Sequence, residues 1–286
     1  MDKKELGWVN GFIGMLIFSG SLPATRAALG GFDPLFVTAA RAGGAGILGA
    51  LFLLAFRQRW PTRQEWETLA RVALGVVVGF PLLSAFALKD ITAAHSLVFV
   101  GLLPLSTASF AAALGGERPH PAFWVFSGLG ATFVAGYALS QGSPGSLVGD
   151  GLMVAAIVIC GFGYAEGGRL SRSLGSWQVI CWALVLSLPF MLPLAILKLP
   201  YASQTIPSPA WVGLAYVTLF SMLVGFFFWY RGLAQGGVAS VSQLQLLQPF
   251  FGLLLSALLL GESVDLAMIA TAAAVILCVA GARRFA

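Results

Sequence analysis

One apolar stretch of the sequence occurs twice. Residues 102–117 read LLPLSTASFAAALGGE, and residues 246–262 read LLQPFFGLLLSALLLGE. In each copy a proline, Pro104 or Pro249, stands thirteen residues before the glutamate of a Gly-Glu pair. Both copies are apolar, yet each contains a residue that cannot complete the hydrogen-bond pattern of a helix. A proline repeated at a fixed place in an apolar segment indicates an internal duplication.

A shift of 145 residues brings the two halves of the chain into register without a gap. The same shift places the Val-Ala-Gly of residues 134–136 on the Val-Ala-Gly of residues 279–281. Identities of Leu and Ala carry little weight in so apolar a chain, because they often arise by chance. The matching positions of the proline, the Gly-Glu pair and Val-Ala-Gly are much harder to explain by chance. The sequence therefore predicts two repeats, 1–140 and 147–286, joined by a linker over 141–146.

The composition excludes a soluble protein. The chain has 286 residues, of which 58% are hydrophobic and 9% charged, and its mean hydropathy is +0.90. Soluble domains carry about 25% charged residues, so this inventory cannot cover a water-facing surface. The three cysteines (Cys160, Cys181 and Cys278) lie in apolar stretches and form no disulfide or zinc pattern. We expect no metal, no cofactor and no nucleic-acid partner.

Apolar segments long enough to cross a bilayer, about 20 residues in a helix, fill almost the whole chain. Polar and Pro/Gly-rich joints divide it into ten such segments, and no joint is long enough for a soluble domain. The predicted spans are 7–27, 35–56, 69–88, 92–114, 122–140, 147–168, 176–197, 210–230, 238–260 and 265–282. The predicted fold is an all-α integral membrane protein with ten transmembrane helices, five in each repeat.

The basic residues set the predicted orientation. The N-terminus, every second joint and the C-terminus together hold twelve of the sixteen Lys and Arg residues. These twelve are Lys3, Lys4, Arg57, Arg59, Arg63, Arg71, Arg118, Arg169, Arg172, Arg231, Arg283 and Arg284. Positive charge stays on the cytoplasmic side of a membrane. We therefore expect a multi-pass protein of a bacterial-type inner membrane with both termini in the cytoplasm.

An odd number of spans in each repeat has a topological consequence. The second repeat must enter the membrane from the opposite side to the first, so the repeats are inverted. Inverted repeats are typical of transporters, whose binding site lies near the bilayer midplane between the two halves. The sequence thus favours a transporter with a small-molecule substrate.

Two five-span units, each with a proline-bearing fourth helix that runs into Gly-Glu, resemble the EamA-type branch of the drug/metabolite transporter superfamily. The resemblance covers the whole chain, and within the branch it is to YddG-like exporters of aromatic and other amino acids. It implies ten helices around a central cavity that opens alternately to either side. It also implies export of aromatic and other neutral amino acids, or of related small metabolites. The Gly-Glu pairs (Gly116-Glu117 and Gly261-Glu262) indicate the superfamily rather than a substrate.

The two prolines fall near the middle of the fourth and ninth predicted spans. A proline there frees a backbone carbonyl and kinks the helix, which membranes tolerate where a neighbour or a watery cavity satisfies the freed group. Pro104 and Pro249 could act as hinges beside the substrate, or they could only shape the packing of the helices. Their equivalent depth in both repeats favours the hinge.

Polar side chains follow one face of the ninth span, where Ser242, Gln245 and Gln248 recur at about one turn. An amide that faces lipid is unfavourable, so this face should meet either a cavity or another helix through hydrogen bonds. The matching face of the fourth span is more apolar and offers His95, Phe99 and Ser106. These six residues are the predicted lining of a cavity that suits a zwitterion or a neutral solute with an apolar side chain.

Three ionisable residues within spans have alternative roles. His95 could couple protons, or it could cap or anchor the end of its helix. Arg41 could hold a substrate carboxylate, or it could extend outward to the membrane surface or pair with Asp33. Glu166, three residues before Arg169, could form an ion pair at the membrane interface or belong to a relay.

No Asp or Glu of the sequence falls near the centre of a predicted span, whereas strongly coupled carriers place carboxylates there. We therefore expect alternating access by facilitated or weakly coupled transport. A broad drug or metabolite carrier is the alternative, and a channel or an intramembrane enzyme is disfavoured by the missing filter and catalytic pairs. No catalytic residue is predicted. Stripes of small residues allow a monomer or a weak dimer.

Overall fold

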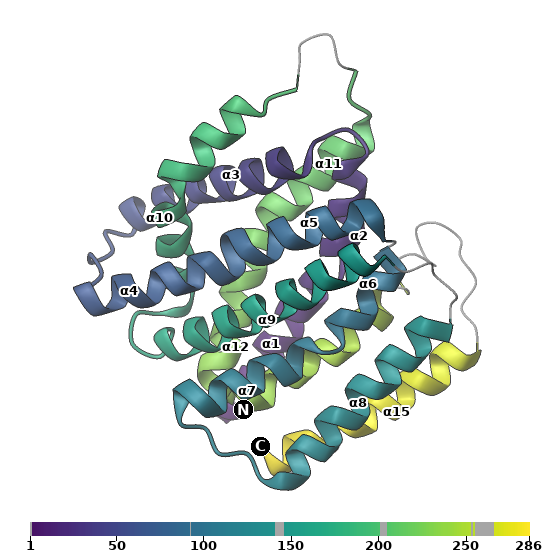
Figure 1. The fold of residues 1–286 in the computed structure, drawn as a ribbon. Helices are drawn as coiled ribbons and strands as arrows, with labels where there is room; N and C mark the ends of the chain where they lie inside the picture. Colours follow the sequence, from purple (N-terminus) through teal and green to yellow (C-terminus); the bar gives the residue numbers. More distant parts are fainter. Residues whose placement is uncertain (1, 92, 141–145, 201–204, 253, 255–265) are drawn as a thin grey trace.

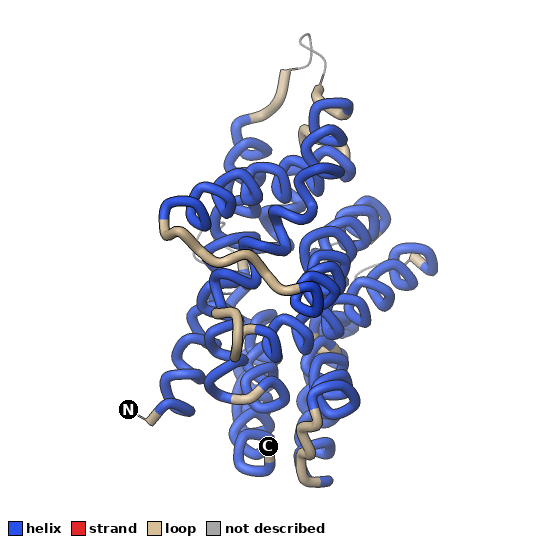
Figure 2. Tube along the Cα trace, turned by 90° about the vertical axis from the view of Figure 1, so that its left-hand side faces the viewer, coloured by secondary structure: helices blue, strands red, loops and turns tan. Residues whose placement is uncertain are grey.

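The computed structural model of the chain describes residues 2–91, 93–140, 146–200, 205–252, 254 and 266–286. Every regular element in these residues is a helix, and they contain no strand (Figure 2). The predicted all-α class is thus confirmed for the described part of the chain. The second Gly-Glu pair, the end of the predicted span 238–260 and most of the predicted linker lie outside it.

The helical segments of the first half follow the predicted spans, with interruptions (Figure 1). They are α1 (Lys3–Ser19), α2 (Ser21–Leu29), α3 (Pro34–Ala55), α4 (Arg63–Val72), η1 (Ala73–Gly79), α5 (Phe80–Asp90), α6 (Ala93–Val100), α7 (Leu103–Gly115) and α8 (Pro121–Ser140). The helices of the second half are α9 (Leu147–Leu170), α10 (Ser176–Leu197), α11 (Ser208–Tyr216), η2 (Val217–Val224), α12 (Gly225–Gly236), α13 (Val238–Ser242), η3 (Gln243–Leu247) and α15 (Leu266–Phe285). A further helical stretch, which contains Pro249, follows η3.

Local sequence explains where several helices begin and end. The Asp33 side chain accepts a hydrogen bond from the Leu35 amide, and Pro34 occupies the first turn of α3. Ser146 caps α9 in the same way through the Gly149 amide. Glycine in a left-handed conformation (φ 69°) ends α7 at Gly116, where a side chain would be strained.

Among the described residues, six helical segments are long and apolar enough to cross a membrane. They are Lys3–Leu29, Pro34–Ala55, Arg63–Asp90, Leu147–Leu170, Ser176–Leu197 and Ser208–Gly236. Large apolar side chains on these segments, such as Leu54 and Phe190, are exposed, which is unfavourable in water but suits a lipid environment. The protein is therefore a multi-pass membrane protein.

Helices from the two halves pack against each other in a repeated pattern. In the first half α1 lies against α12 and α2 against α11, and in the second half α9 lies against η1 and α5. The helix pairs α3–α10 and α8–α15 each join one helix from either half, and the second of these pairs forms one edge of the molecule in Figure 1. The core thus lies between the halves rather than within either one.

Small residues bring the helices into close contact. A side chain added at Gly232 of α12 would lie 2.6 Å from the backbone nitrogen of Gly11 in α1. One added at Gly75 in η1 would lie 2.8 Å from the Cα atom of Gly163 in α9. These contacts join the backbones of opposite halves, as small residues commonly do in membrane bundles.

Candidate functional site

A narrow cavity of about 30 Å³ lies between the two halves. It is bordered by helical segments from both ends of the chain, which the packing described above brings together. Its lining residues are Phe18, Ser21, Leu22, Arg41, Val76, Phe80, Val100, Leu103, Cys160, Tyr164, Ser221, Phe226 and Gln248. We call it the central cavity.

Two segments of unusual helix form opposite parts of its wall. In η1 and η2 the backbone hydrogen bonds run from residue i to i+5 rather than to i+4, a geometry that is rare in proteins and concentrated at functional sites. Val76 in η1 and Ser221 in η2 both line the cavity, and they are 145 residues apart. Each half of the chain therefore contributes one such irregular turn to the lining of the cavity.

The two prolines interrupt their helices beside the cavity. The helix breaks between α6 and α7, where the Leu102 amide donates to the Phe99 carbonyl and Pro104 starts the new helix. Before Pro249 the chain tightens into the 3₁₀ turn η3. Leu103 and Gln248, again 145 residues apart, line the cavity next to these interruptions.

Arg41 is the cation of the central cavity. The residue is only 5% exposed, and its Nη2 atom donates to the Ser221 hydroxyl at 3.1 Å. The Ser221 hydroxyl in turn lies 2.7 Å from that of Ser21. Arg41 Nε has no hydrogen-bond partner, and no carboxylate of the described residues forms an ion pair with this guanidinium. The contact predicted as one alternative, with Asp33, is not formed; Asp33 caps α3 instead.

Aromatic rings form the other wall of the central cavity. The Phe18 ring lies 5.0 Å from that of Phe226 and 6.4 Å from that of Tyr164, and the latter two rings are 6.0 Å apart. Tyr164 and Phe226 come from α9 and α12, so the second half supplies most of this wall. A buried cation opposite aromatic faces can hold a molecule with an anionic group at one end and an apolar body at the other.

The three residues of the ninth span that were predicted to line the cavity have different surroundings in the structure. Gln248 borders the central cavity, and its Nε2 atom donates to the Phe18 carbonyl at 3.2 Å. Gln245 is buried beside Tyr164 without bordering the cavity. Ser242 is completely buried and donates to the Ala239 carbonyl of its own helix.

The predicted residues of the fourth span lie outside the central cavity. His95 Nε2 is 2.9 Å from a carboxylate oxygen of Asp150 in α9, and the His95 ring contacts that of Phe99 at 5.8 Å. The Ser106 hydroxyl donates to the Ile157 carbonyl of α9 at 3.3 Å. These contacts connect the fourth span to α9, which is the interhelical alternative for polar side chains in a membrane bundle.

Glu166 joins two arginines. It is 1% exposed, and its carboxylate oxygens lie 2.9 Å from Arg71 and 2.7 Å from Arg169. Arg71 belongs to α4 in the first half, so the carboxylate connects the halves. This arrangement is the ion pair expected from the sequence, with a second arginine that the sequence did not indicate.

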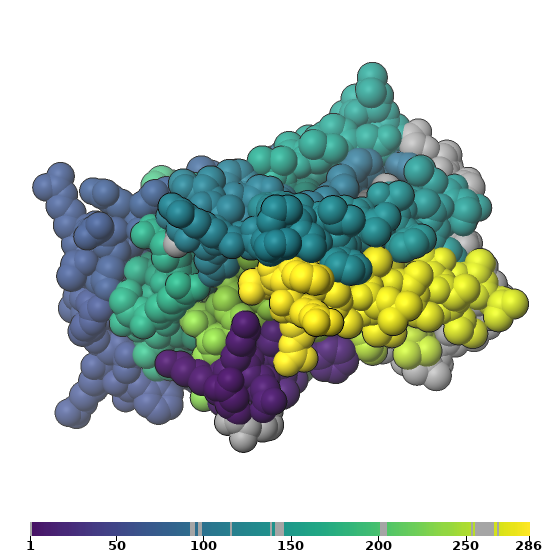
Figure 3. All heavy atoms as spheres, turned by 90° about the horizontal axis from the view of Figure 1, so that it is seen from below, coloured from purple at the N-terminus to yellow at the C-terminus, as the bar shows by residue number. Residues whose placement is uncertain are grey.

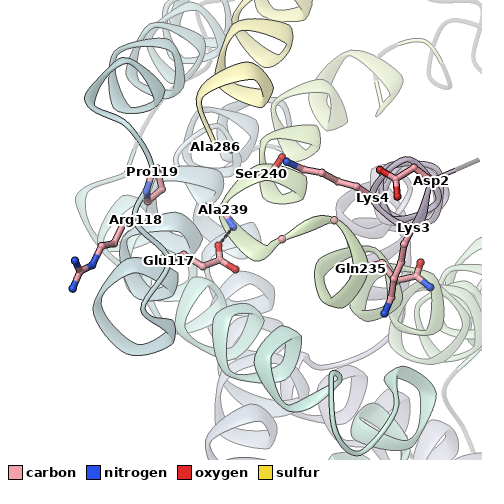
Figure 4. Close-up of a pocket in the computed structure, with 12 residues that line it drawn as sticks. Asp2, Lys3, Lys4, Glu117, Arg118, Pro119, Gln235, Ala239, Ser240 and Ala286 are labelled. Carbon is pink, nitrogen blue, oxygen red and sulfur yellow. Dashed lines mark hydrogen bonds between the residues drawn. The ribbon is translucent and has the colours of Figure 1, made fainter.

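At the end of the bundle where both termini lie, Glu117 connects the segment after α7 to α13 and to Arg172. Its carboxylate accepts from the backbone amides of Val238 at 3.0 Å and Ala239 at 2.8 Å, at the start of α13. It also pairs with Arg172 at 2.7 Å. Figure 4 shows Glu117 directed at the start of α13, in a surface depression next to the N-terminal residues. A carboxylate at a helix N-terminus is favourable because it satisfies free amides and meets the positive end of the helix dipole.

At the other end of the bundle α2 contacts α5. The Arg26 guanidinium donates to the Leu88 carbonyl at the end of α5. Leu22, Leu88 and Val100 form a buried apolar cluster beneath this contact. A space of about 30 Å³ has room for a water molecule or two, whereas pockets for small organic ligands measure roughly 300–1,000 Å³. In the described structure the central cavity is thus too small for such a ligand.

Sequence reasoning missed Ser21, Tyr164 and Ser221. A serine or tyrosine in an apolar span has many equivalents in this chain, and only the 145-residue relation of Ser221 to Val76 could have pointed to it. A group of three or more His, Cys, Asp or Glu side chains that could hold a metal ion does not occur in the described residues.

Comparisons with known proteins give the family. The model of the EamA-like transporter family matches residues 5–139 and again 147–283. The protein named "Uncharacterized transporter YdeK" of Bacillus subtilis (strain 168) is 61% identical over 286 residues, the full length of both chains. A solved structure titled "Crystal structure of protein" matches with a TM-score of 0.81 at 21% identity, over 98% of this chain and 99% of that one, which supports the fold.

The family and the name of this relative both describe transporters rather than enzymes. The two family matches together cover nearly all of the sequence and include every residue that lines the central cavity. The chain belongs to the EamA-like transporter family of the drug/metabolite transporter superfamily.

Proposed function

We propose that the protein is a ten-span carrier built from two inverted five-helix repeats, 1–140 and 147–286, around the central cavity. The separate family matches to 5–139 and 147–283 support this division. So does the packing, because the contact of the α1–α2 span with α11 and α12 has a counterpart in the contact of α9 with η1 and α5. The irregular segments η1 and η2, which the same 145-residue shift relates, give further support.

The carrier works by alternating access. The small volume of the central cavity supports this mechanism, since a carrier must pass through a state in which little space remains between its two halves. Opening toward the termini requires the contacts of Glu117 to break, and opening toward the other end requires those of Arg26 to break. Pro104 and Pro249 are the hinges, because each interrupts a helix beside the cavity.

The substrate is a small organic molecule with a carboxylate and an apolar body, and aromatic and other neutral amino acids are the first choice. The observation that carries this proposal is Arg41, a buried cation at the cavity without a carboxylate partner among the described residues. A substrate carboxylate would supply its missing partner. The substrate's apolar side chain would then lie among Phe18, Tyr164 and Phe226, whose ring faces can also attract an ammonium group.

Transport is facilitated or weakly coupled, and its direction in the cell is export. The lining of the central cavity contains no Asp or Glu among the described residues, which supports the absence of a strong proton or sodium coupling site. The protein lies in a bacterial-type inner membrane with both termini in the cytoplasm. The basic residues near the termini and on alternate connections support that orientation.

The experiment that tests the substrate class uses purified protein in liposomes and a set of related solutes. Efflux of labelled phenylalanine, threonine and methionine is measured, with phenylalanine amide and phenylpropionate as competitors. We expect phenylpropionate, which keeps the carboxylate, to compete and the amide, which lacks it, to fail. Competition by the amide alone would refute the role of Arg41.

A broad drug or metabolite carrier is the second candidate. The aromatic wall of the central cavity favours it, since such surfaces accept many apolar bodies. Efflux of an apolar cationic dye at a rate similar to that of phenylalanine would support this alternative over the amino acid carrier.

A further inference from the structure

A second hollow lies on the end of the bundle where both termini lie, between the starts of α1 and α10 and the end of α12. Its volume is about 630 Å³, and its lining includes Lys3, Arg172, Arg231, Trp177, Phe227 and Phe228. We call it the basic groove. It is separate from the central cavity, because the two share no lining residue.

The basic groove carries positive charge only. Lys3, Arg172 and Arg231 line it, and no Asp or Glu of the described chain does. Arg172 shares its charge with Glu117 at 2.7 Å, whereas Lys3 and Arg231 are exposed and form no ion pair with any described residue. Two unpaired cations in one groove attract an anion with several acceptor oxygens.

The groove continues into an aromatic surface, in which Trp177 and Phe227 are half-buried against the core and Phe52 and Phe56 are exposed. The Trp177 ring lies 6.4 Å from that of Phe227 and 5.7 Å from that of Phe56, and the Phe227 ring lies 6.1 Å from that of Phe52. Phe52 is 38% exposed and Phe56 is 64% exposed, at the end of α3. Phe52 lies one helical turn deeper in the bundle than Phe56, so the aromatic surface runs from the charged rim toward the membrane interior.

We propose that the basic groove binds the phosphate headgroup of an anionic phospholipid, with an acyl chain along the aromatic surface. A soluble phosphate would fit the cations but would leave the exposed rings without a partner. A lipid satisfies both parts, and basic pockets between transmembrane helices at the cytoplasmic side commonly bind anionic headgroups. Tryptophan at this level also suits the boundary between headgroups and chains.

The lipid site has a connection to the closed end of the bundle. Arg172 lines the groove and also pairs with Glu117, which caps α13. A phosphate in the groove competes with Glu117 for this arginine. Bound anionic lipid therefore weakens one of the contacts that close this end.

The test is native mass spectrometry of the full chain, titrated in detergent with phosphatidylglycerol or phosphatidylcholine. The variant carries Lys3→Gln and Arg231→Gln, and the matched control carries Lys89→Gln and Lys198→Gln, which remove the same charge at the other end. At about 1 kcal/mol for each cation near a lipid surface, the variant should retain phosphatidylglycerol about thirtyfold more weakly than wild type. The control should match wild type.

Three results would overturn the proposal. Equal retention by the variant and wild type would exclude the groove, and equal retention of phosphatidylcholine would exclude recognition of negative charge. Displacement of the lipid by millimolar inorganic phosphate would show a site for the free anion instead. If the variant does not fold, photo-crosslinking of wild type with a headgroup-labelled phosphatidylglycerol decides: the label should map to Gly225–Gly236, and its absence there refutes the site.

Discussion

Replacement of Arg41 by methionine separates a binding role from a structural one. Methionine keeps the apolar stem of the side chain but lacks the charge and the donors of the guanidinium, so it removes the group that contacts Ser221. The wild-type guanidinium is buried with one hydroxyl partner at 3.1 Å and no carboxylate among the described residues. The variant thus removes an interaction with the substrate without breaking an ion pair of the empty protein.

The magnitude follows from the proposed pair. Removal of one partner from a buried, hydrogen-bonded charge pair costs roughly 2–5 kcal/mol. At about 3 kcal/mol, the half-saturation constant for phenylalanine should rise about 150-fold, since 1.4 kcal/mol corresponds to tenfold. Arg41→Lys keeps the charge but loses the planar geometry, so we expect a rise of about tenfold.

The stability of the empty Arg41→Met protein should stay the same or increase, although its affinity for the substrate falls. A buried charge without a counter-ion is unfavourable, so the melting temperature of Arg41→Met in detergent should equal or exceed that of wild type. Efflux from liposomes over a range of substrate concentrations and thermal unfolding of the same preparations measure both quantities. Lys198→Met at the end of α10 is the control for loss of charge alone.

Two outcomes would refute the reasoning. Arg41→Met with the half-saturation constant of wild type would show that the guanidinium does not hold the substrate. A melting temperature several degrees lower would show that Arg41 supports the fold, and a loss of transport would then have no bearing on the substrate.

Three further predictions concern closure, lining and packing. Glu117→Gln weakens the capping contact by about 1–2 kcal/mol. Labelling of Ser240→Cys in the adjoining depression by a membrane-impermeant maleimide should then accelerate about 5- to 30-fold, and an unchanged labelling rate contradicts the closing role of Glu117. Gln248→Ala removes the amide between the cavity and the Phe18 carbonyl, and amino acid efflux should slow at least severalfold, whereas wild-type efflux would mark that amide as dispensable. Gly75→Ala places a methyl group 2.7 Å from the Ile159 carbonyl and should lower stability by about 1–3 kcal/mol, while Gly128→Ala, with nothing within 4 Å, should not; equal melting of the two variants refutes the close packing.

Sequence reasoning predicted most helix limits closely. The spans expected at 147–168 and 176–197 are α9, Leu147–Leu170, and α10, Ser176–Leu197. These limits are local: apolar runs end where Pro, Gly or charge begins, and the capping residues stand next to them. The family could also be recognised from the sequence, because the proline and the Gly-Glu pair recur at the same spacing in both halves of the chain.

The interiors of the helices were less predictable. Nothing in the sequence indicates that Ala73–Gly79 and Val217–Val224 adopt a wider turn, since their composition equals that of ordinary apolar helix. The wider turn depends on the close approach of α9 to Gly75, which is a property of the packed bundle. Periodicity cannot reveal it.

The candidate site, like the helices, could be predicted from the sequence only in part. A duplicated, all-helical membrane protein of a transporter family could be predicted from the residues alone, because composition, charge distribution and repeat register are read directly from the sequence. Which polar residues meet depends on the packing of the helices, which brings Arg41 to Ser221, Gln248 to Phe18 and His95 to Asp150. Polar side chains in a membrane satisfy themselves with whichever partner lies nearest in space, and that partner is set by helix packing rather than by spacing along the chain.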